Sequence, residues 1–160
     1  MEAIMKIWKN LRPENIFLNA ELPDKDAVLR FVADACVRNR IVSEGDALYN
    51  GLRQREQSMS TGIGDGIAFP HSTHPEAADA AVLLIRPSKP LEFESIDSLP
   101  VGIILAIVIP EHQTALHLQI LGGIARLCKN REILRTIREA RDSESLWEFI
   151  RNLEEKMAFH

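Results

Sequence analysis

The segment "STGIGDGIAFPHSTHPE" (residues 60–76) places three alternate glycines before a short apolar run, a proline and two histidines. Glycine permits tight turns and a close approach of the backbone, and the apolar run 67–69 is typical of a strand. Pro70 fixes its own φ and pushes the residue before it toward an extended conformation. We therefore expect a stiff backbone leading into His71.

Helical patterns precede this segment. Apolar spacing predicts a short helix at the N-terminus, and Asp24 and Ser43 each stand where a helix N-cap is expected. The helix after Ser43 should run to about Glu56, and a brief strand should precede the helix after Asp24. The N-terminal helix would contain Ile4, Ile7, Trp8 and Leu11, and the strand residues 16–18.

Strands and then helices follow the segment. The runs 67–69, 81–85 and 101–109 are apolar and separated by Gly, Pro, Ser and Asp, so we expect them to be strands. Thr114 can cap a helix that runs to about Lys129 and turns Leu118 inward, and 131–140 and 142–156 predict two more helices. Helices around continuously apolar strands imply an α/β fold with a covered sheet.

Length and composition fit one globular domain of 160 residues, 46% of them hydrophobic and 26% charged. The net charge of -4 leaves no basic field to hold nucleic acid. The longest apolar run, 101–109, is too short to cross a membrane, and the N-terminus has no secretory signal pattern. Cys36 and Cys128 lie in apolar helical patterns, as expected of free buried thiols in the cytoplasm.

Two phosphate-binding motifs are excluded around the glycines. No Lys-Ser/Thr pair follows, as a Walker loop requires, and Ile67 occupies the last glycine position of the dinucleotide fingerprint. His71 is instead suited to accept a phosphoryl group, because a neutral imidazole is a nucleophile near pH 7. The transfer needs positioning and charge stabilisation, for which the hydroxyls of Ser72 and Thr73 are candidates. A loop histidine without catalytic function is the alternative.

His117 and Arg55 are candidate partners of His71. His117 lies in the first turn of the helix that Thr114 opens, where free N–H groups and the helix dipole attract anions. Arg55 has a fork of donors suited to phosphoryl oxygens, and Arg53 is a rival for that role. For each of them, an ordinary helix residue is the alternative.

A metal site is a competing hypothesis. His71 and His74 have the spacing H-x2-H, and His112 and His117 the spacing H-x4-H. Zinc needs three or four converging ligands, whereas no HExxH motif occurs and predicted strands separate the two pairs. A histidine-rich metal-dependent hydrolase is therefore the weaker hypothesis, and we expect neither a metal nor a cofactor.

Four ordered segments resemble a known family: TGIGDGIAFPH (61–71), PLEFESID (90–97), LPVGIILAIVIP (99–110) and HLQILGGIARL (117–127). They are similar to enzyme IIA domains of the fructose–mannitol class of the bacterial phosphoenolpyruvate-dependent sugar phosphotransferase system, and most similar to its nitrogen-regulatory branch. The resemblance implies a mixed central sheet flanked by helices on both sides. It also implies one domain over residues 1–160 with its core at about 16–150.

By this resemblance, His71 is the phosphorylated histidine and takes the phosphoryl group from the phosphocarrier protein HPr or its nitrogen-branch paralogue. His117 matches the second active-site histidine, and Arg55, rather than Arg53, the active-site arginine. The chain would then be a cytoplasmic phosphocarrier, either regulatory or passing the group to a separate enzyme IIB in sugar transport. The lack of a fused IIB or membrane domain favours regulation. A binding module that has lost phosphotransfer is a third hypothesis.

The chain departs from the family pattern at two places. Asp65 stands where the family often has Asn. Ser72 and Thr73 follow the histidine where the family commonly has Gly or Ala and then a basic residue. Because a carboxylate beside a phosphoryl dianion would be unfavourable, we expect Asp65 to point away from His71.

Overall fold

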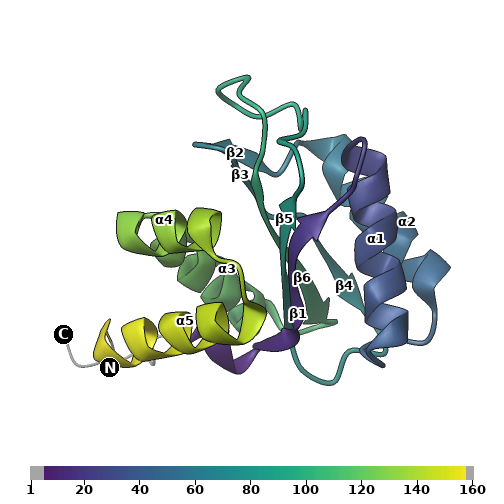
Figure 1. Cartoon of the computed structure of the whole chain (residues 1–160). Coiled ribbons are helices and arrows are strands. Elements are labelled where there is room, and N and C mark those ends of the chain that lie inside the picture. Colours follow the sequence, from purple (N-terminus) through teal and green to yellow (C-terminus); the bar gives the residue numbers. More distant parts are fainter. Residues whose placement is uncertain (1–5, 158–160) are drawn as a thin grey trace.

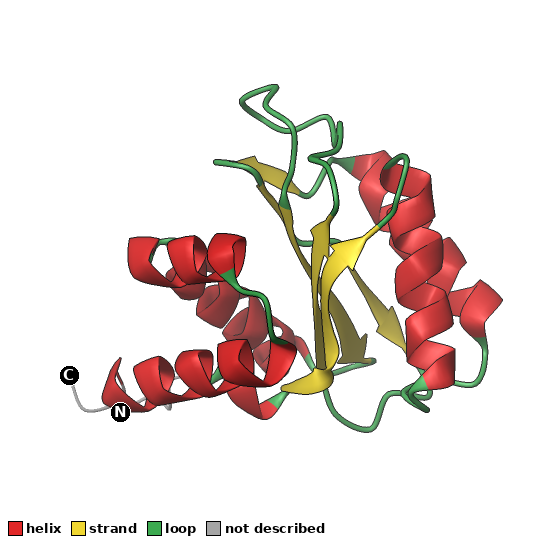
Figure 2. Ribbon diagram, in the orientation of Figure 1, coloured by secondary structure: helices red, strands yellow, loops and turns green. Residues whose placement is uncertain are grey.

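A computed structural model of the chain describes residues 6–157, in which six strands form one sheet with helices on both faces (Figures 1 and 2). The strand order is β1-β5-β6-β3-β2, and β4 also pairs with β6. The strands are β1 (Leu11–Ala20), β2 (Gly62–Gly64), β3 (Ile67–Ala68), β4 (His71–His74), β5 (Ala81–Pro87) and β6 (Ile103–Pro110). The helices are α1 (Lys25–Arg38), α2 (Gly45–Ser58), α3 (Thr114–Cys128), α4 (Arg131–Glu139) and α5 (Ser143–Met157), after a 3-10 turn at Ile7–Lys9.

The sheet is mixed, as the resemblance implied. β1 is parallel to β5, β3 and β4 are parallel to β6, and the pairs β5–β6 and β2–β3 are antiparallel. The apolar run at 101–109 lies largely in the buried strand β6. Among residues 6–157, no helix combines the length and apolar character needed to cross a membrane.

The central strands are apolar throughout because both of their faces are covered. Side chains alternate across a strand, so the even-numbered residues 104–108 of β6 pack with α1 and α2. The odd-numbered residues 103–109 pack with α3, α4 and α5 on the other face. The same alternation in β5 sends residues 83 and 85 to the first core and 82 and 84 to the second. Figure 2 shows these two helical layers on opposite sides of the sheet.

β3 and β4 lie one after the other along the same side of β6. Ile67 pairs with Ile103, and His71 pairs with Ile107. Between them, the carbonyl of Pro70 accepts a hydrogen bond of 3.0 Å from the N–H of Ile107, while proline has no N–H of its own to continue the ladder. His71 is therefore the first residue of a strand, and the prediction of a loop histidine is wrong.

The alternate glycines build the β2–β3 hairpin. Gly64, Asp65 and Gly66 have φ values of 98°, 57° and 77°. A two-residue hairpin turn of type I′ needs positive φ at both central residues, which here are Asp65 and Gly66. β3 confirms the strand predicted at 67–69. β2 was not predicted, because three residues carry too little periodicity to identify a strand.

Of the three predicted caps, one is confirmed. Asp24 accepts a hydrogen bond of 2.8 Å from the N–H of Ala27. Ser43 does not cap α2; its own N–H and that of Glu44 instead donate to the carboxylate of Glu76, which follows β4. An anion at a helix N-terminus is favourable, so a residue distant in sequence supplies this cap.

Thr114 is the first residue of α3 and not its cap. The N-cap position is occupied by Gln113, which makes no side-chain cap bond. Of the inward stripe predicted for α3 (Leu118, Leu121, Ile124, Ala125 and Cys128), Ile124 is buried as expected, but Leu118 is 66% exposed. Ile120, which was not predicted, is buried beside Ile124. Of the two free cysteines, Cys36 is buried as expected and Cys128 is half-buried.

The predicted N-terminal helix is also wrong over its described residues. From residue 6 onward, only Ile7–Lys9 form a helical turn before β1, and Leu11 already pairs with Val82 of β5. Ile4 lies outside the described residues. Pairing with a buried strand explains why β1 has ten residues rather than the brief strand predicted at 16–18.

Candidate functional site

A pocket of about 650 Å³ opens between α2, β4 and the first turn of α3. All five predicted site residues line it: Arg55, His71, Ser72, Thr73 and His117. Arg53, the rival of Arg55, does not line it. The other residues that line the pocket are Ala47, Asn50, Gly51, Gln54, His74, Pro75 and Glu111.

The imidazole of His71 is held in one orientation at the base of β4. The side chain is only 6% exposed, and its Nδ1 lies 3.0 Å from the carbonyl oxygen of Phe69. Since a carbonyl can only accept, Nδ1 carries the proton and Nε2 keeps its lone pair. Burial lowers the pKa of His71, with the Phe69 carbonyl opposing this shift. The ring is therefore neutral near pH 7 and has a free nucleophilic nitrogen.

His117 and Arg55 lie beside His71, as the sequence predicted. The ring centroids of His71 and His117 are 5.5 Å apart and the planes meet at 75°. The guanidinium of Arg55 donates from Nη1 to the carbonyl of Met59 at 2.8 Å. After burial, the charge of the Arg55 guanidinium and the neighbouring His117 also lower the pKa of His71. The pocket thus brings together the imidazole of His71 and two groups that can donate hydrogen bonds.

Ser72 and Thr73 lie at the edge of the pocket. The hydroxyl of Ser72 donates to the carbonyl of Thr73 at 2.9 Å. Ser72 also touches α2 where Gly51 has no side chain: a Cβ added at Gly51 would overlap the Ser72 hydroxyl and lie 3.4 Å from Ser72 Cβ. The glycine therefore lets α2 and β4 approach closely, which brings Arg55 near His71.

Asp65 lies outside this pocket, as expected. It is in the β2–β3 turn, where its N–H donates to Asp97 at 3.0 Å and its carbonyl accepts from Arg138 at 3.1 Å. β3 pairs with the start of β6 and β4 with its end. The turn and His71 are therefore separated along the sheet.

Sequence analysis missed three residues that shape the site: Gly51, Glu56 and Glu76. Two of them had a signal. Gly51 is a glycine inside a helical pattern, and Glu56 continues the buried spacing of Leu48 and Leu52 by one more helical turn. Glu76 had none, because its contact with the start of α2 depends on the fold.

The histidines do not form a metal site. Within residues 6–157, no three His, Cys, Asp or Glu side chains lie close enough together to hold a metal ion. Nδ1 of His74 accepts from the N–H of Glu76 at 3.1 Å, and the side chain of His112 is 95% exposed. The described residues thus give no support to the metal-dependent hydrolase.

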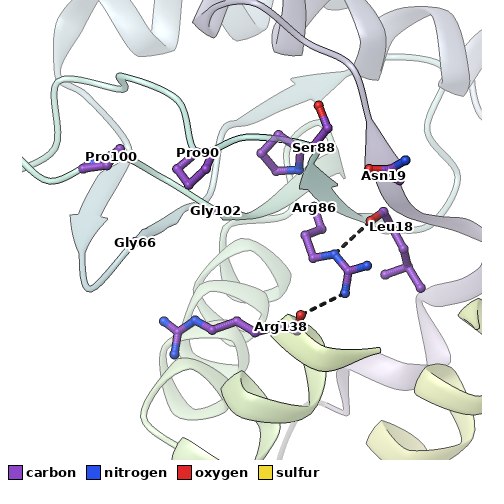
Figure 3. Close-up of a pocket in the computed structure, with 10 residues that line it drawn as sticks. Leu18, Asn19, Gly66, Arg86, Ser88, Pro90, Pro100, Gly102 and Arg138 are labelled. Atoms are coloured by element: carbon purple, nitrogen blue, oxygen red, sulfur yellow. Dashed lines mark hydrogen bonds between the residues drawn. The ribbon is translucent and has the colours of Figure 1, made fainter. Parts of the chain in front are cut away.

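A second cavity, of about 520 Å³, contains Arg86 and Arg138 (Figure 3). Arg86 donates from Nε to the carbonyl of Leu18 at 2.8 Å and from Nη1 to the carbonyls of Ile137 and Ala140 at 2.8 and 2.6 Å. These carbonyls end α4, and a cation there satisfies them and opposes the helix dipole. Arg86 is therefore a helix-capping residue.

The family model for the phosphoenolpyruvate-dependent sugar phosphotransferase system, EIIA 2, matches residues 9–153. The chain belongs to this family. A nitrogen regulatory protein homolog of Haemophilus influenzae is 26% identical over 147 residues, covering 90% of each chain. The crystal structure of nitrogen regulatory protein IIA-Ntr from Neisseria meningitidis matches with a TM-score of 0.83 and 26% identity, covering 90% of this chain and 98% of that one.

Mannitol enzyme IIA of Escherichia coli shares the fold. Its structure, solved in complex with phosphorylated enzyme IIB, matches with a TM-score of 0.73 and 18% identity over 89% of this chain and 99% of that chain. This EIIA 2 chain is therefore a phosphocarrier protein of this system, similar to nitrogen regulatory members, with sugar-specific members as more distant structural neighbours.

Proposed function

We propose that this EIIA 2 protein carries the phosphoryl group on Nε2 of His71. The observation that supports the proposal is the fixed tautomer: Nδ1–H is bound to the Phe69 carbonyl at 3.0 Å, and the ring borders a pocket shared with His117 and Arg55. A bond forms between Nε2 and phosphorus while the bond from phosphorus to the donor atom breaks. The donor atom keeps the electron pair, and the Nδ1 proton stays where it is.

His117 and Arg55 are proposed to stabilise the moving phosphoryl group. Phosphoryl transfer depends mainly on positioning and on donors aimed at the equatorial oxygens. Arg55 brings a permanent positive charge, and His117 can donate an N–H. Ser72 and Thr73 would add hydroxyl donors only after small rotations, because Ser72 is bonded to Thr73.

The proposed donor is a protein, HPr or its nitrogen-branch paralogue. Apolar side chains are exposed beside the site residues: Met59 is 72% exposed and Leu118 is 66% exposed. Met59 holds Arg55 through its carbonyl, and Leu118 follows His117. A docking partner would cover such side chains as it approaches His71.

A regulatory role is favoured over sugar transport. A nitrogen regulatory protein of Klebsiella oxytoca shares 36% identity over 64% of this chain, whereas a fructose-specific EIIABC component of Bacillus subtilis shares 27% over 91%. A phosphoryl group adds up to about two negative charges to one local surface, which can change the protein partner bound there. Transfer to a separate enzyme IIB is the alternative. The expected compartment is the cytoplasm, where phosphoenolpyruvate is made.

The test is phosphotransfer from phosphoenolpyruvate through enzyme I and HPr, read by intact mass. Wild type should gain one phosphoryl group and His71→Ala none, while His112→Ala, a change at a histidine exposed by 95%, should behave as wild type. Gain by His71→Ala would move the site elsewhere. If the wild type gains no phosphoryl group from either HPr or its nitrogen-branch paralogue, the protein would instead be a binding module that has lost phosphotransfer.

A further inference from the structure

A buried ion pair lies behind the site, at the end of α2. Nζ of Lys25 is 3.0 Å from Oε2 of Glu56, and the two side chains are 19% and 4% exposed. Thr61 completes the cluster, because its N–H donates to Glu56 at 3.2 Å and its hydroxyl donates to the same carboxylate. Glu56 does not line the pocket, so it cannot touch a group bound there.

Two connections run from this cluster to the site, the first through hydrogen bonds and the second along the main chain. In the first, the carbonyl of Thr61 accepts from the N–H of Phe69 at 3.1 Å. The carbonyl of Phe69 then accepts from Nδ1 of His71 at 3.0 Å. Glu56 is therefore linked, through Thr61 and Phe69, to the hydrogen bond that fixes the tautomer of His71.

The second connection leads to Arg55. Thr61 is bonded to Glu56, and two residues before it the carbonyl of Met59 accepts from Arg55 Nη1 at 2.8 Å. Between them, Ser60 donates to the carbonyl of Phe93 at 2.5 Å. The segment 59–61 is therefore held at Ser60 and Thr61 and carries the carbonyl that binds the guanidinium.

We propose that Glu56 is a positioning residue, which from outside the pocket sets the orientation of both His71 and Arg55 for phosphoryl transfer. The inference rests on the proposed function. It goes beyond a stabilising role, because a buried ion pair can often be replaced by apolar side chains without loss of stability. A carboxylate, in contrast, fixes its donors in direction as well as in distance.

The charges around Glu56 support the same conclusion. Lys25 faces it from the start of α1, and Arg55, His71 and His117 lie toward the pocket. Glu94 reaches only Lys25, at 3.9 Å, and its side chain is 81% exposed. The negative charge of Glu56 raises the pKa of His71 against the larger lowering by burial.

The test uses Glu56→Gln, which keeps the size of the side chain and removes the charge. Its matched control is Glu94→Gln, which also touches Lys25 but from the surface. Two readouts are needed: the rate at which His71 is phosphorylated, and the tautomer and pKa of His71 in the unphosphorylated protein by nitrogen-15 NMR. A melting curve checks folding.

The proposal expects Glu56→Gln to slow phosphorylation by roughly tenfold to a hundredfold and to lower the pKa of His71, while Glu94→Gln matches wild type. Folded Glu56→Gln with the wild-type rate and an unchanged His71 resonance would overturn it. If Glu56→Gln does not fold, Thr61→Val takes its place, since it keeps the charge and removes the hydroxyl donor. It should slow transfer in the same direction, and a wild-type rate would overturn the proposal.

Failure of the proposed function would look different. A wild type that accepts no phosphoryl group refutes phosphotransfer on His71, yet the NMR measurement still decides whether Glu56 controls the His71 ring. A change of tautomer there supports the positioning role, and an unchanged ring refutes it.

Discussion

Replacing Gly51 by alanine tests whether the contact between α2 and β4 governs the site. Inside a helix, Gly→Ala alone is favourable by about 1 kcal/mol. At this position, however, the new Cβ overlaps the Ser72 hydroxyl and comes within 3.4 Å of Ser72 Cβ. Ser72 must rotate and lose its bond to the Thr73 carbonyl, at about 1 kcal/mol. Overpacking against β4 costs a further 1–3 kcal/mol or so.

These opposing terms predict that Gly51→Ala is less stable than wild type by roughly 1–3 kcal/mol. For a chain of this size that is a drop in melting temperature of about 2–12 °C. In a Ser72→Ala background the hydroxyl is absent, and the same substitution should be close to neutral or stabilising. The phosphorylation rate of His71 should fall in Gly51→Ala and recover in part in the double variant.

The assay is a double-mutant cycle measured by thermal or urea unfolding, with intact-mass kinetics on the same four proteins. A coupling energy of about 1–2 kcal/mol between the two positions is expected for residues in contact. If Gly51→Ala stabilises the wild type and the Ser72→Ala protein equally, and the phosphorylation rate of His71 is unchanged, then α2 and β4 do not approach closely at this position.

Three further predictions concern single contacts. Glu76→Ala should weaken the start of α2: the Ser43 hydroxyl and the Ser43 and Glu44 N–H groups lower the pKa of Glu76. Glu76→Ala should therefore be less stable than wild type by its full amount above pH 4.5, the ordinary pKa. The difference should be lost as the pH falls from 4.5 through the lowered pKa of Glu76, as melting curves across pH would show. Arg86→Met should cost about 2–3 kcal/mol by releasing the α4 carbonyls and leave the phosphorylation rate unchanged; a slower rate would link that end of the sheet to the site. Arg55→Gln should raise the pKa of His71, because the guanidinium lowers it, and slow phosphorylation by about tenfold or more; an NMR titration with the wild-type midpoint would remove Arg55 from the pocket.

The parts of the fold that could be predicted are those with a local cause. A run of continuous apolar residues predicts the long strand β6, and Asp24 at the N-cap predicts the start of α1. The short strands β2 and β4 exist because they pair with neighbours, and no local pattern marks them. The cap of α2 was missed for the same reason, since Glu76 reaches Ser43 across 33 positions.

The site divides in the same way. His71, His117 and Arg55 could be predicted as site residues from their chemistry and from the resemblance, and the structure brings them to one pocket. The contacts that hold these side chains in place could not be predicted. The tautomer of His71 depends on the Phe69 carbonyl, and the place of Arg55 depends on Met59. Main-chain carbonyls are present at every residue, so only the folded path of the chain shows which ones matter.

The placement of negative charge explains how the site can accept a dianion. Glu56 is neutralised by Lys25, and Glu76 is bound to the N-terminus of α2. Asp65 lies at the far end of the sheet. Among the described residues that line the pocket, Glu111 is the one carboxylate and Arg55 has the one guanidinium. Phosphorylation would therefore turn a nearly uncharged pocket into one with a charge of about −2. A partner that binds this face can distinguish the two states by electrostatics alone, without any change in the fold.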